Sequence, residues 1–191
     1  ETAVYTPSEN WHRDGILEWS LAPARVDQET QQRAVAVALQ IASWLNYCGV
    51  LAVEFFITQD QQLLVNEIAP RPHNTGHYTL DACVTSQFEQ QVRTLCGLPL
   101  GDTSLKGAAA MVNLLGDLWQ GQTPPPWEKI LSQPRTKLHL YGKVEARPGR
   151  KMGHYTCLAE EVDAAFKQAL AIQAALQAVP TRTRTFFAQQ P

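Results

Sequence analysis

The segment VLAVEFFITQDQQLLVNEIAPRPHNTGHYT, residues 50–79, decides the fold. Its two short, strand-like apolar runs are separated by the polar TQDQQ, and this layout predicts a β-hairpin. A turn centred on Asp60 and Gln61 would place Glu54 directly opposite Glu67. Two carboxylates facing each other at about 5 Å destabilise a sheet unless they share a proton or bind a cation.

The neighbours of the two carboxylates strengthen this prediction. By strand alternation, apolar residues share their face, namely Ala52, Phe56, Leu63, Val65 and Ala69. Magnesium suits an all-carboxylate pair, because it keeps other coordination positions for water and phosphate oxygens. The sequence is equally compatible with a solvated acidic patch on the outside of the hairpin, and a one-residue change of register would remove the argument.

The residues after the second strand predict an anion site. Arg71 lies between two prolines, which fix its backbone. A guanidinium held in this way suits two-point capture of a carboxylate, bicarbonate or phosphoryl group. His73 and Asn74 add hydrogen-bonding groups beside it, and Gly76 allows a tight turn before His77. The alternative is a structural proline turn with a surface arginine.

The rest of the chain predicts an α+β fold. A strand is expected at residues 16–21, an amphipathic helix from an N-cap at Asp27 to a C-cap at Gly49, and a helix at residues 85–95. A short β-like start is expected in the first residues. Beyond CGLPLGD, strands are expected in AAAMVNLLG and TKLHLYGKVE, a short helix near PPPWEKIL, and a helix at residues 161–178. We therefore expect domains at 1–100 and 101–180, with a polar tail at 181–191.

Composition excludes several classes of protein. The 191 residues carry a net charge of only -2 and are 45% hydrophobic, which indicates a globular protein without the basic excess of a nucleic-acid-binding domain. No apolar run approaches the roughly 20 residues that cross a bilayer, and no signal peptide is visible. We expect a soluble, cytoplasmic protein. The four cysteines lie in or beside apolar sequence without a CxxC spacing, which favours buried reduced thiols over disulfides or a metal site.

A second group of basic residues surrounds the turn RPGR. Its members are Lys143, Arg147, Arg150, Lys151 and His154. Cations gathered at one hairpin tip favour an anion site, and a phosphate monoester is the simplest ligand. A solvated basic turn is the alternative. The tetrapeptide GHYT occurs at 76–79 and again at 153–156, but the flanking residues differ, so no internal repeat is predicted.

Four stretches resemble a known family. ENWHRDGILEWSLAPA, VEFF, NEIAPRPHNTGHYTLDACVTSQFEQ and YGKVEARPGRKMGH are similar to the C-terminal half of the N5-carboxyaminoimidazole ribonucleotide synthetases. The resemblance implies the C-terminal half of an ATP-grasp domain, an antiparallel sheet with helices, followed by a small β-rich domain. Ala69 stands where other ATP-grasp enzymes have an Asn, so no metal ligand is carried over to that position.

The resemblance also implies a reaction. ATP, bicarbonate and 5-aminoimidazole ribonucleotide would give ADP, phosphate and the N5-carboxylated product through carboxyphosphate, in purine synthesis. Glu54 and Glu67 match the ligands of the Mg²⁺ that accompanies ATP. Arg71, His73 and Asn74 match the group that holds bicarbonate or carboxyphosphate. Lys143 and Arg150 match the positions that grip the ribonucleotide phosphate, with Arg147, Lys151, His77 and His154 as neighbours.

The resemblance has a limited extent. The family's N-terminal domain and first ATP-grasp subdomain have no counterpart here, so we expect an incomplete chain that does not turn over by itself, from a parent that forms a homodimer. Two alternatives remain open at this point. One is another ATP-grasp carboxylase or ligase, and the other is a non-catalytic anion-binding or dimerisation module.

Overall fold

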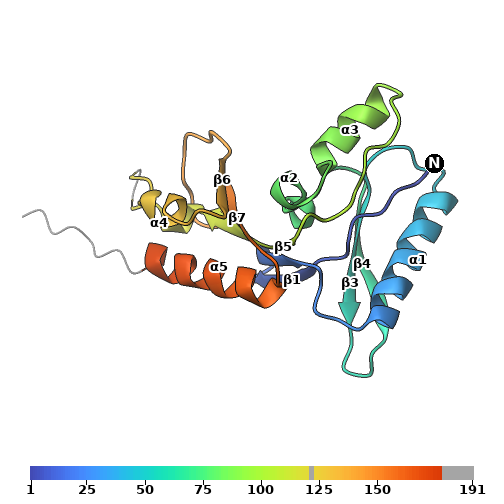
Figure 1. Ribbon diagram of the computed structural model, residues 1–191, viewed down its shortest axis with the longest axis horizontal. Helices are drawn as coiled ribbons and strands as arrows, with labels where there is room; N and C mark the ends of the chain where they lie inside the picture. Colours follow the sequence, from blue (N-terminus) through green and yellow to red (C-terminus); the bar gives the residue numbers. More distant parts are fainter. Residues whose placement is uncertain (121–122, 178–191) are drawn as a thin grey trace, which may run out of the picture.

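The computed structural model describes residues 1–120 and 123–177, and within them it forms two antiparallel sheets (Figure 1). The larger has the order β1-β2-β5-β7-β6, with bounds Glu9–Arg13, Ile16–Ala22, Ala108–Leu115, Lys151–Ala159 and Thr136–Leu140. The smaller is the hairpin of β3 (Ala52–Ile57) and β4 (Leu63–Ala69). The helical elements are α1 (Gln28–Trp44), η1 (Asn74–Gly76), α2 (Thr79–Ala82), α3 (Gln87–Leu95), η2 (Gly116–Leu118), α4 (Glu128–Leu131) and α5 (Val162–Gln177).

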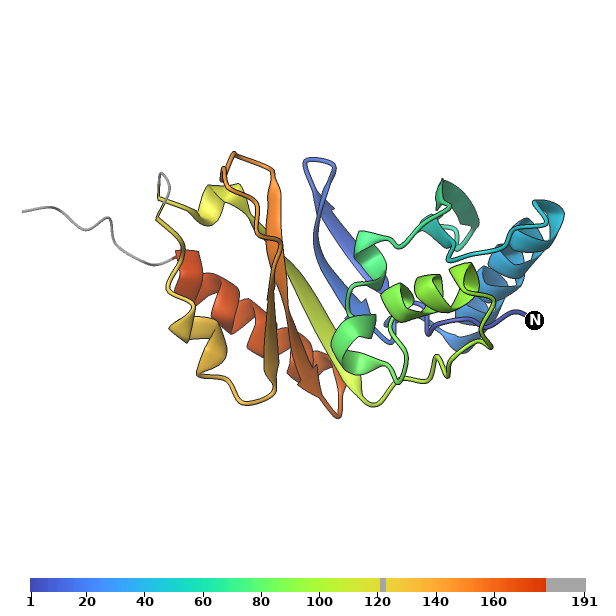
Figure 2. The ribbon, with the colours of Figure 1, turned by 90° about the horizontal axis from the view of Figure 1, so that it is seen from above.

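The larger sheet separates two apolar clusters. Side chains of β5 alternate between the faces: Ala110, Val112 and Leu114 pack with α5, whereas Ala109 and Met111 pack with α2. Figure 2 shows α5 and α2 on opposite sides of this sheet. The predicted α+β class is confirmed, and the face toward α2 is the one that carries the polar residues described below.

The first hairpin was not predicted. Residues 1–5 form no strand, and β1 lies instead in the polar ENWHR. The connection is Asp14-Gly15, in which both residues have positive φ angles of 51° and 75°, as a type I′ hairpin turn requires. The sequence Asp-Gly before an apolar strand was the available signal.

The predicted pairing of Glu54 with Glu67 is confirmed, although the register toward the turn is not. Ile57 pairs with Leu63 instead of Leu64, so the pairing next to the turn differs by one residue from the expected register. A β-bulge beyond Glu54 restores the register at the carboxylates. The predicted apolar surroundings are wrong on the turn side of the bulge, because Phe56 and Val65 are exposed.

The predicted helix after residue 27 is confirmed at its start and wrong at its end. Asp27 accepts a hydrogen bond from Thr30 N, as an N-cap does, but α1 ends at Trp44. Asn46, with φ 45°, takes the left-handed position that was assigned to Gly49. The apolar stripe of α1 lines a cavity of about 920 Å³ between α1, the N-terminal segment and β3.

The C-terminal elements occur where they were expected, but the strand expected in TKLHLYGKVE ends at Leu140, so its second half is not a strand. α5 ends within the described residues at Gln177; the expected last residue, 178, and the tail at 181–191 lie outside them. The division at residue 100 stays a prediction, and the larger sheet crosses it because β1 and β2 pair with β5. All four cysteines are free; Cys83 and Cys157 are buried as expected, but Cys48 and Cys96 are exposed. Within the described ranges, no helix has the length and apolarity to span a bilayer.

Candidate active site

The two facing carboxylates meet an imidazole. His73 Nδ1 lies 3.6 Å from Glu54 Oε1, and His73 Nε2 lies 3.8 Å from Glu67 Oε1. The Glu54 side chain is only 11% exposed and that of Glu67 is 51% exposed. Glu54 Oε1 is buried without a hydrogen-bond partner among the described residues. A buried, unsatisfied carboxylate oxygen beside a second carboxylate is a site that attracts a cation.

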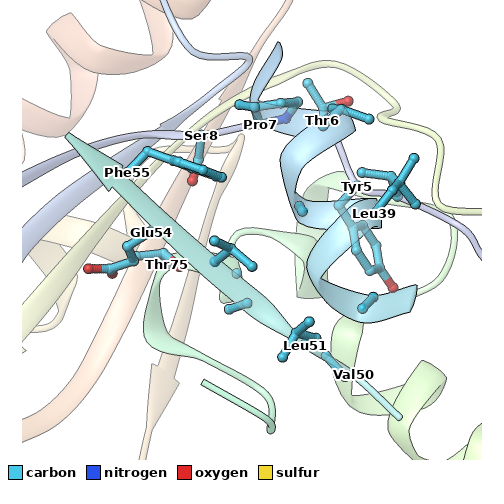
Figure 3. Close-up of a pocket in the computed structure, with 18 of the residues that line it drawn as sticks. Tyr5, Thr6, Pro7, Ser8, Leu39, Val50, Leu51, Glu54, Phe55 and Thr75 are labelled. Carbon is cyan, nitrogen blue, oxygen red and sulfur yellow. The ribbon is translucent and has the colours of Figure 1, made fainter. Parts of the chain in front are cut away.

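Figure 3 shows how Glu54 lies in the fold. The Glu54 carboxylate points away from α1, whereas Tyr5 and Leu39 lie on the α1 side of β3. Thr75 lies beside Glu54, and its hydroxyl is 3.0 Å from His73 Nδ1. Burial lowers the pKa of His73, and the charges of Glu54 and Glu67 oppose that shift. The ring is therefore held in a partly buried position next to both acids.

A row of polar residues crosses the larger sheet below this site. Asn113 pairs with His154 and His154 pairs with His139, so one side chain from each of β5, β7 and β6 lies on the α2 face. The segment that packs over them presents Asn74, His77 and Asp81 at helical spacing. We call these six residues the polar row.

Each residue of the sheet meets one from the segment above it. Asn113 and Asn74 exchange two amide hydrogen bonds of 2.7 and 3.0 Å. The ring centroids of His154 and His77 are 5.0 Å apart. His139 Nε2 lies 2.9 Å from Asp81 Oδ2. This matched pairing fixes the segment that follows Arg71 and His73 onto the sheet.

The middle of the polar row holds neutral histidines. His154 is 1% exposed; its Nδ1 lies 2.8 Å from the Tyr141 hydroxyl, and its Nε2 has no hydrogen-bond partner among the described residues. Burial, reinforced by the neighbouring histidines, lowers the pKa of His154 to about 3. For His77, burial, with smaller effects of Lys151, His73 and His139, lowers the pKa to about 4.

Ligand atoms of Asp81, His139 and His154 lie within 4.8 Å of one another, which is close enough to suggest a metal site. The two imidazoles, however, are stacked, with centroids 4.6 Å apart and an angle of 20° between their planes. A metal bound by an imidazole lies close to the plane of the ring, so two nearly parallel rings cannot share one ion. We assign this trio to polar packing.

The basic residues act on the carboxylate pair through Lys151. Lys151 is half-buried, and its pKa is lowered by burial, with Arg71 and Lys143 acting in the same direction and Glu54 and Glu67 against it. Lys151 is thus within electrostatic range of both the carboxylate pair and the basic loop. Lys143 Nζ donates to the Lys151 carbonyl at 2.6 Å and lies over the Tyr141 ring.

The loop between β6 and β7 is organised by its own cations. Arg150 donates to the carbonyl of Glu145 at 3.0 Å, and Arg147 lies 3.7 Å from the Glu145 carboxylate. Gly149 N donates to Asp117 Oδ2 at 2.7 Å, which ties the loop to η2. His154, predicted near the tip, lies instead in the polar row, because it is the fourth residue of β7 and faces α2.

Comparison with known proteins identifies the family. The ATP-grasp domain matches residues 1–88, and the phosphoribosylaminoimidazole carboxylase C-terminal domain matches residues 109–168. N5-carboxyaminoimidazole ribonucleotide synthase of Bacillus subtilis (strain 168) is 50% identical over 163 residues, which are 85% of this chain and 42% of that protein. The chain belongs to the N5-carboxyaminoimidazole ribonucleotide synthase family.

Solved structures of this synthase family agree with the fold. An ADP complex of an N5-carboxyaminoimidazole ribonucleotide synthetase is 44% identical with a TM-score of 0.82, over 91% of this chain and 45% of that one. The Aspergillus clavatus synthase in complex with ADP and 5-aminoimidazole ribonucleotide is 32% identical with a TM-score of 0.80, over 90% of this chain and 46% of that one. The expected ATP-grasp fold is confirmed. The chain spans less than half the length of these relatives.

The structure brings most of the predicted synthase residues together. Glu54, Glu67 and His73 are in contact, and the charges of Arg71 and Lys143 act on Lys151, which is also within electrostatic range of the two glutamates. Asn74 contacts Asn113 in the polar row, not the carboxylates. The sequence interpretation missed Asn113, His139, Asp81 and Gln87. A lone Asn within the apolar run AAAMVNLL was a signal for the first of them, because a buried amide needs a partner.

Acid is expected to destabilise this synthase-family protein through the two neutral histidines. His77 and His154 have pKa values of about 4 and about 3 when folded, whereas unfolded histidines titrate near about 6.5. Between the folded and the unfolded pKa of each histidine, the unfolded state binds more protons than the folded state. The free energy of unfolding therefore falls as the pH drops below about 6.5, down to about 4 for His77 and about 3 for His154. Each histidine adds a slope of up to about 1.4 kcal/mol per pH unit.

Urea unfolding at several pH values between about 7.5 and about 4.5 measures this slope. His154→Gln should reduce it by the contribution of one proton. His12→Gln, which removes an exposed histidine of β1, is the matched control. A slope that is the same in wild type and His154→Gln would contradict the assignment of a neutral buried His154.

Proposed function

We propose that the protein carries out the ATP-dependent carboxylation of 5-aminoimidazole ribonucleotide by bicarbonate. The products are N5-carboxyaminoimidazole ribonucleotide, ADP and phosphate, in de novo purine synthesis. The observation that carries the proposal is the facing pair Glu54 and Glu67 in contact with His73. The names of the relatives, and the ADP and ribonucleotide bound to the Aspergillus clavatus relative, support the substrates.

The carboxylate pair fits a magnesium ion. Glu54 Oε1 is buried and lacks a hydrogen-bond partner among the described residues, and Glu67 adds a second carboxylate directly across the hairpin. Oxygen ligands of this kind suit a hard cation that also binds phosphate oxygens. When bound with ATP, Mg²⁺ would neutralise the phosphate charge that moves during phosphoryl transfer. Glu54 and Glu67 would hold it.

Arg71 is the main group for bicarbonate and carboxyphosphate in this proposal. Its guanidinium is exposed and donates only to the Pro72 carbonyl, at 3.1 Å, among the hydrogen bonds of the described residues. The remaining N–H groups are available to a planar oxyanion. His73, which contacts both glutamates, would face the same anion. Asn74 donates one amide N–H to Asn113, and its second amide N–H is available to the anion. Fixed donors of this kind stabilise the anion as it develops.

The basic loop would hold the ribonucleotide phosphate. Lys143 and Arg150 are both fixed by hydrogen bonds to backbone carbonyls, of Lys151 in β7 and of Glu145 in the loop, so their charges are preorganised for a dianion. Lys143 of this loop contacts the Lys151 carbonyl, and the charges of Glu54 and Glu67 also act on Lys151. A phosphate held by the basic loop would therefore keep the ribonucleotide close to the carboxylate pair.

Assembly and compartment are part of the proposal. We infer a homodimer of the full-length protein in the cytoplasm, with ATP, bicarbonate and the ribonucleotide as its small-molecule partners. The net charge of -2 gives no support to nucleic-acid binding. Size-exclusion chromatography with light scattering of the complete gene product would test the dimer.

An omission series tests the activity. ADP release by the complete gene product is measured with ATP, Mg²⁺, bicarbonate and 5-aminoimidazole ribonucleotide, and then with each left out in turn. The proposal expects release only when all four are present. Release with formate in place of bicarbonate, or with another amine, would indicate a different ATP-grasp ligase. Ribonucleotide binding without any ADP release would indicate a non-catalytic module.

A further inference from the structure

Gln87 connects the two histidines of the site. It is the first residue of α3, is 4% exposed, and its side chain reaches back toward η1. Its Oε1 accepts from the His73 backbone N–H at 2.9 Å, and its Nε2 donates to the His73 carbonyl at 2.8 Å. The same Nε2 lies 2.9 Å from His77 Nδ1. The amide thus binds both backbone groups of one histidine and the ring of the other.

These partners fix the orientation of the Gln87 amide. Oε1 must face the His73 N–H group, and Nε2 must face the His73 carbonyl. The opposite assignment would point the amide NH₂ at the N–H group and the amide oxygen at the carbonyl, so that neither contact could be a hydrogen bond. One Nε2 proton points to the His73 carbonyl, and the other points to His77 Nδ1. Nδ1 therefore accepts, and the neutral His77 ring carries its proton on Nε2.

The region around Gln87 leaves it little freedom. Its own backbone N–H donates to Thr79 Oγ1 at 3.0 Å, and that hydroxyl donates to the Gly76 carbonyl at 2.6 Å. A Cβ atom on Gly76 would lie 2.7 Å from Gln87 Oε1, so a glycine is needed where the amide passes. The Gln87 amide therefore holds the His73 backbone against α3 through both its N–H and its carbonyl.

We propose that Gln87 is a positioning residue for the carboxylation: it fixes the His73 backbone beside Glu54 and Glu67 and fixes His77 as the Nε2–H tautomer. This inference rests on the proposed function. His73 has its ring 3.6 and 3.8 Å from the two carboxylates, so a shift of its backbone moves the ring relative to both. His77 then presents a neutral N–H donor on the side of the ring away from Gln87.

The chain offers a matched control on the same helix. Gln90 is also 4% exposed, and its amide likewise accepts from a backbone N–H at 2.9 Å and donates to a carbonyl at 2.8 Å. Both groups belong to Gly101, in the loop after α3. Gln90→Ala therefore removes the same two backbone hydrogen bonds without touching His73 or His77.

The first test compares the two alanine variants in the complete gene product. Both should lose a similar amount of stability in urea unfolding, because both lose a buried amide with its backbone partners. Only Gln87→Ala should reduce kcat, by about 100-fold, because its loss lets the His73 backbone move. Gln90→Ala should keep wild-type kcat. Equal kcat values for the two variants at equal stability would overturn the inference.

The second test reads the tautomer of His77 directly by NMR of its imidazole nitrogens. Wild type should show the proton on Nε2 and a bare Nδ1. In Gln87→Glu the carboxylate accepts but cannot donate, so the proton should move to Nδ1. A wild-type ring with its proton on Nδ1 would overturn the assignment.

The two tests separate the inference from the proposed function. The NMR measurement needs no substrate, so it decides the tautomer whether or not ADP is released. If wild type shows no ribonucleotide-dependent ADP release, the proposed function fails and with it the catalytic part of the inference. If wild type is active and Gln87→Ala matches Gln90→Ala, only the inference fails.

Discussion

Replacing Glu67 with Gln is expected to reduce ribonucleotide-dependent ADP release by at least about 100-fold, a loss typical of removing one group that stabilises charge in the transition state. The side chain is 51% exposed and lies opposite Glu54, so the neutral amide fits the same space. Only the charge that would hold the cation is lost. Glu89→Gln, on the exposed face of α3, is the matched control.

The same variant is expected to be at least as stable as wild type when Mg²⁺ is absent. Like charges directly opposite in a sheet destabilise it by about 0.2–1 kcal/mol, and Glu67→Gln removes that repulsion. Adding Mg²⁺ with ADP should stabilise wild type, because a ligand that binds only the folded state raises its stability. It should do so much less for Glu67→Gln. A variant that unfolds more easily without Mg²⁺ and keeps its activity would contradict the account of the carboxylate pair.

Lys143→Ala and Arg150→Ala are each expected to raise the KM for the ribonucleotide by about 10- to 100-fold, because a hydrogen bond to a charged group is worth about 1.5–3 kcal/mol. The kcat at saturating ribonucleotide should change much less, since the phosphate is bound in the same way in the ground state and the transition state. The measurement is steady-state kinetics of ADP release against ribonucleotide concentration.

Lys129→Ala, on the exposed surface of α4, is the control for the loss of a positive charge. Its KM should equal that of wild type. If Lys143→Ala and Arg150→Ala also leave the KM unchanged, the basic loop does not bind the phosphate. A loss of kcat with an unchanged KM would instead place these two residues at the transferring group.

The carboxylate pair shows what the sequence predicts and what it does not. Strand alternation and the polar TQDQQ predict a hairpin in which Glu54 faces Glu67, and this pairing is observed. The correct pairing came from two departures that cancel: the pairing next to the turn is shifted by one residue, and the bulge shifts the register back. Neither the turn nor the bulge is marked by a Gly or Pro in the sequence. In the turn, Gln61 takes the left-handed position with φ 62°.

The polar row shows the limit of local reasoning. Asn113, His154 and His139 are 15 to 41 residues apart in the chain and become neighbours only through the order β5-β7-β6. Residues 74, 77 and 81 have helical spacing, but the preceding prolines concealed a helical segment there. The two GHYT sequences adopt different structures, a helical turn and a strand, as expected if the recurrence is chance. Their histidines, His77 and His154, are nevertheless in contact, with ring centroids 5.0 Å apart and planes tilted by 38°.

The most direct test of the central claim follows the carbon of bicarbonate. The complete gene product is incubated with radiolabelled bicarbonate, ATP, Mg²⁺ and 5-aminoimidazole ribonucleotide, and the label in the ribonucleotide is compared with the ADP formed. The account predicts equal amounts of labelled N-carboxylated product and ADP in wild type, and neither in Glu67→Gln. ADP released without label in the ribonucleotide, or label incorporated without ADP, would contradict it.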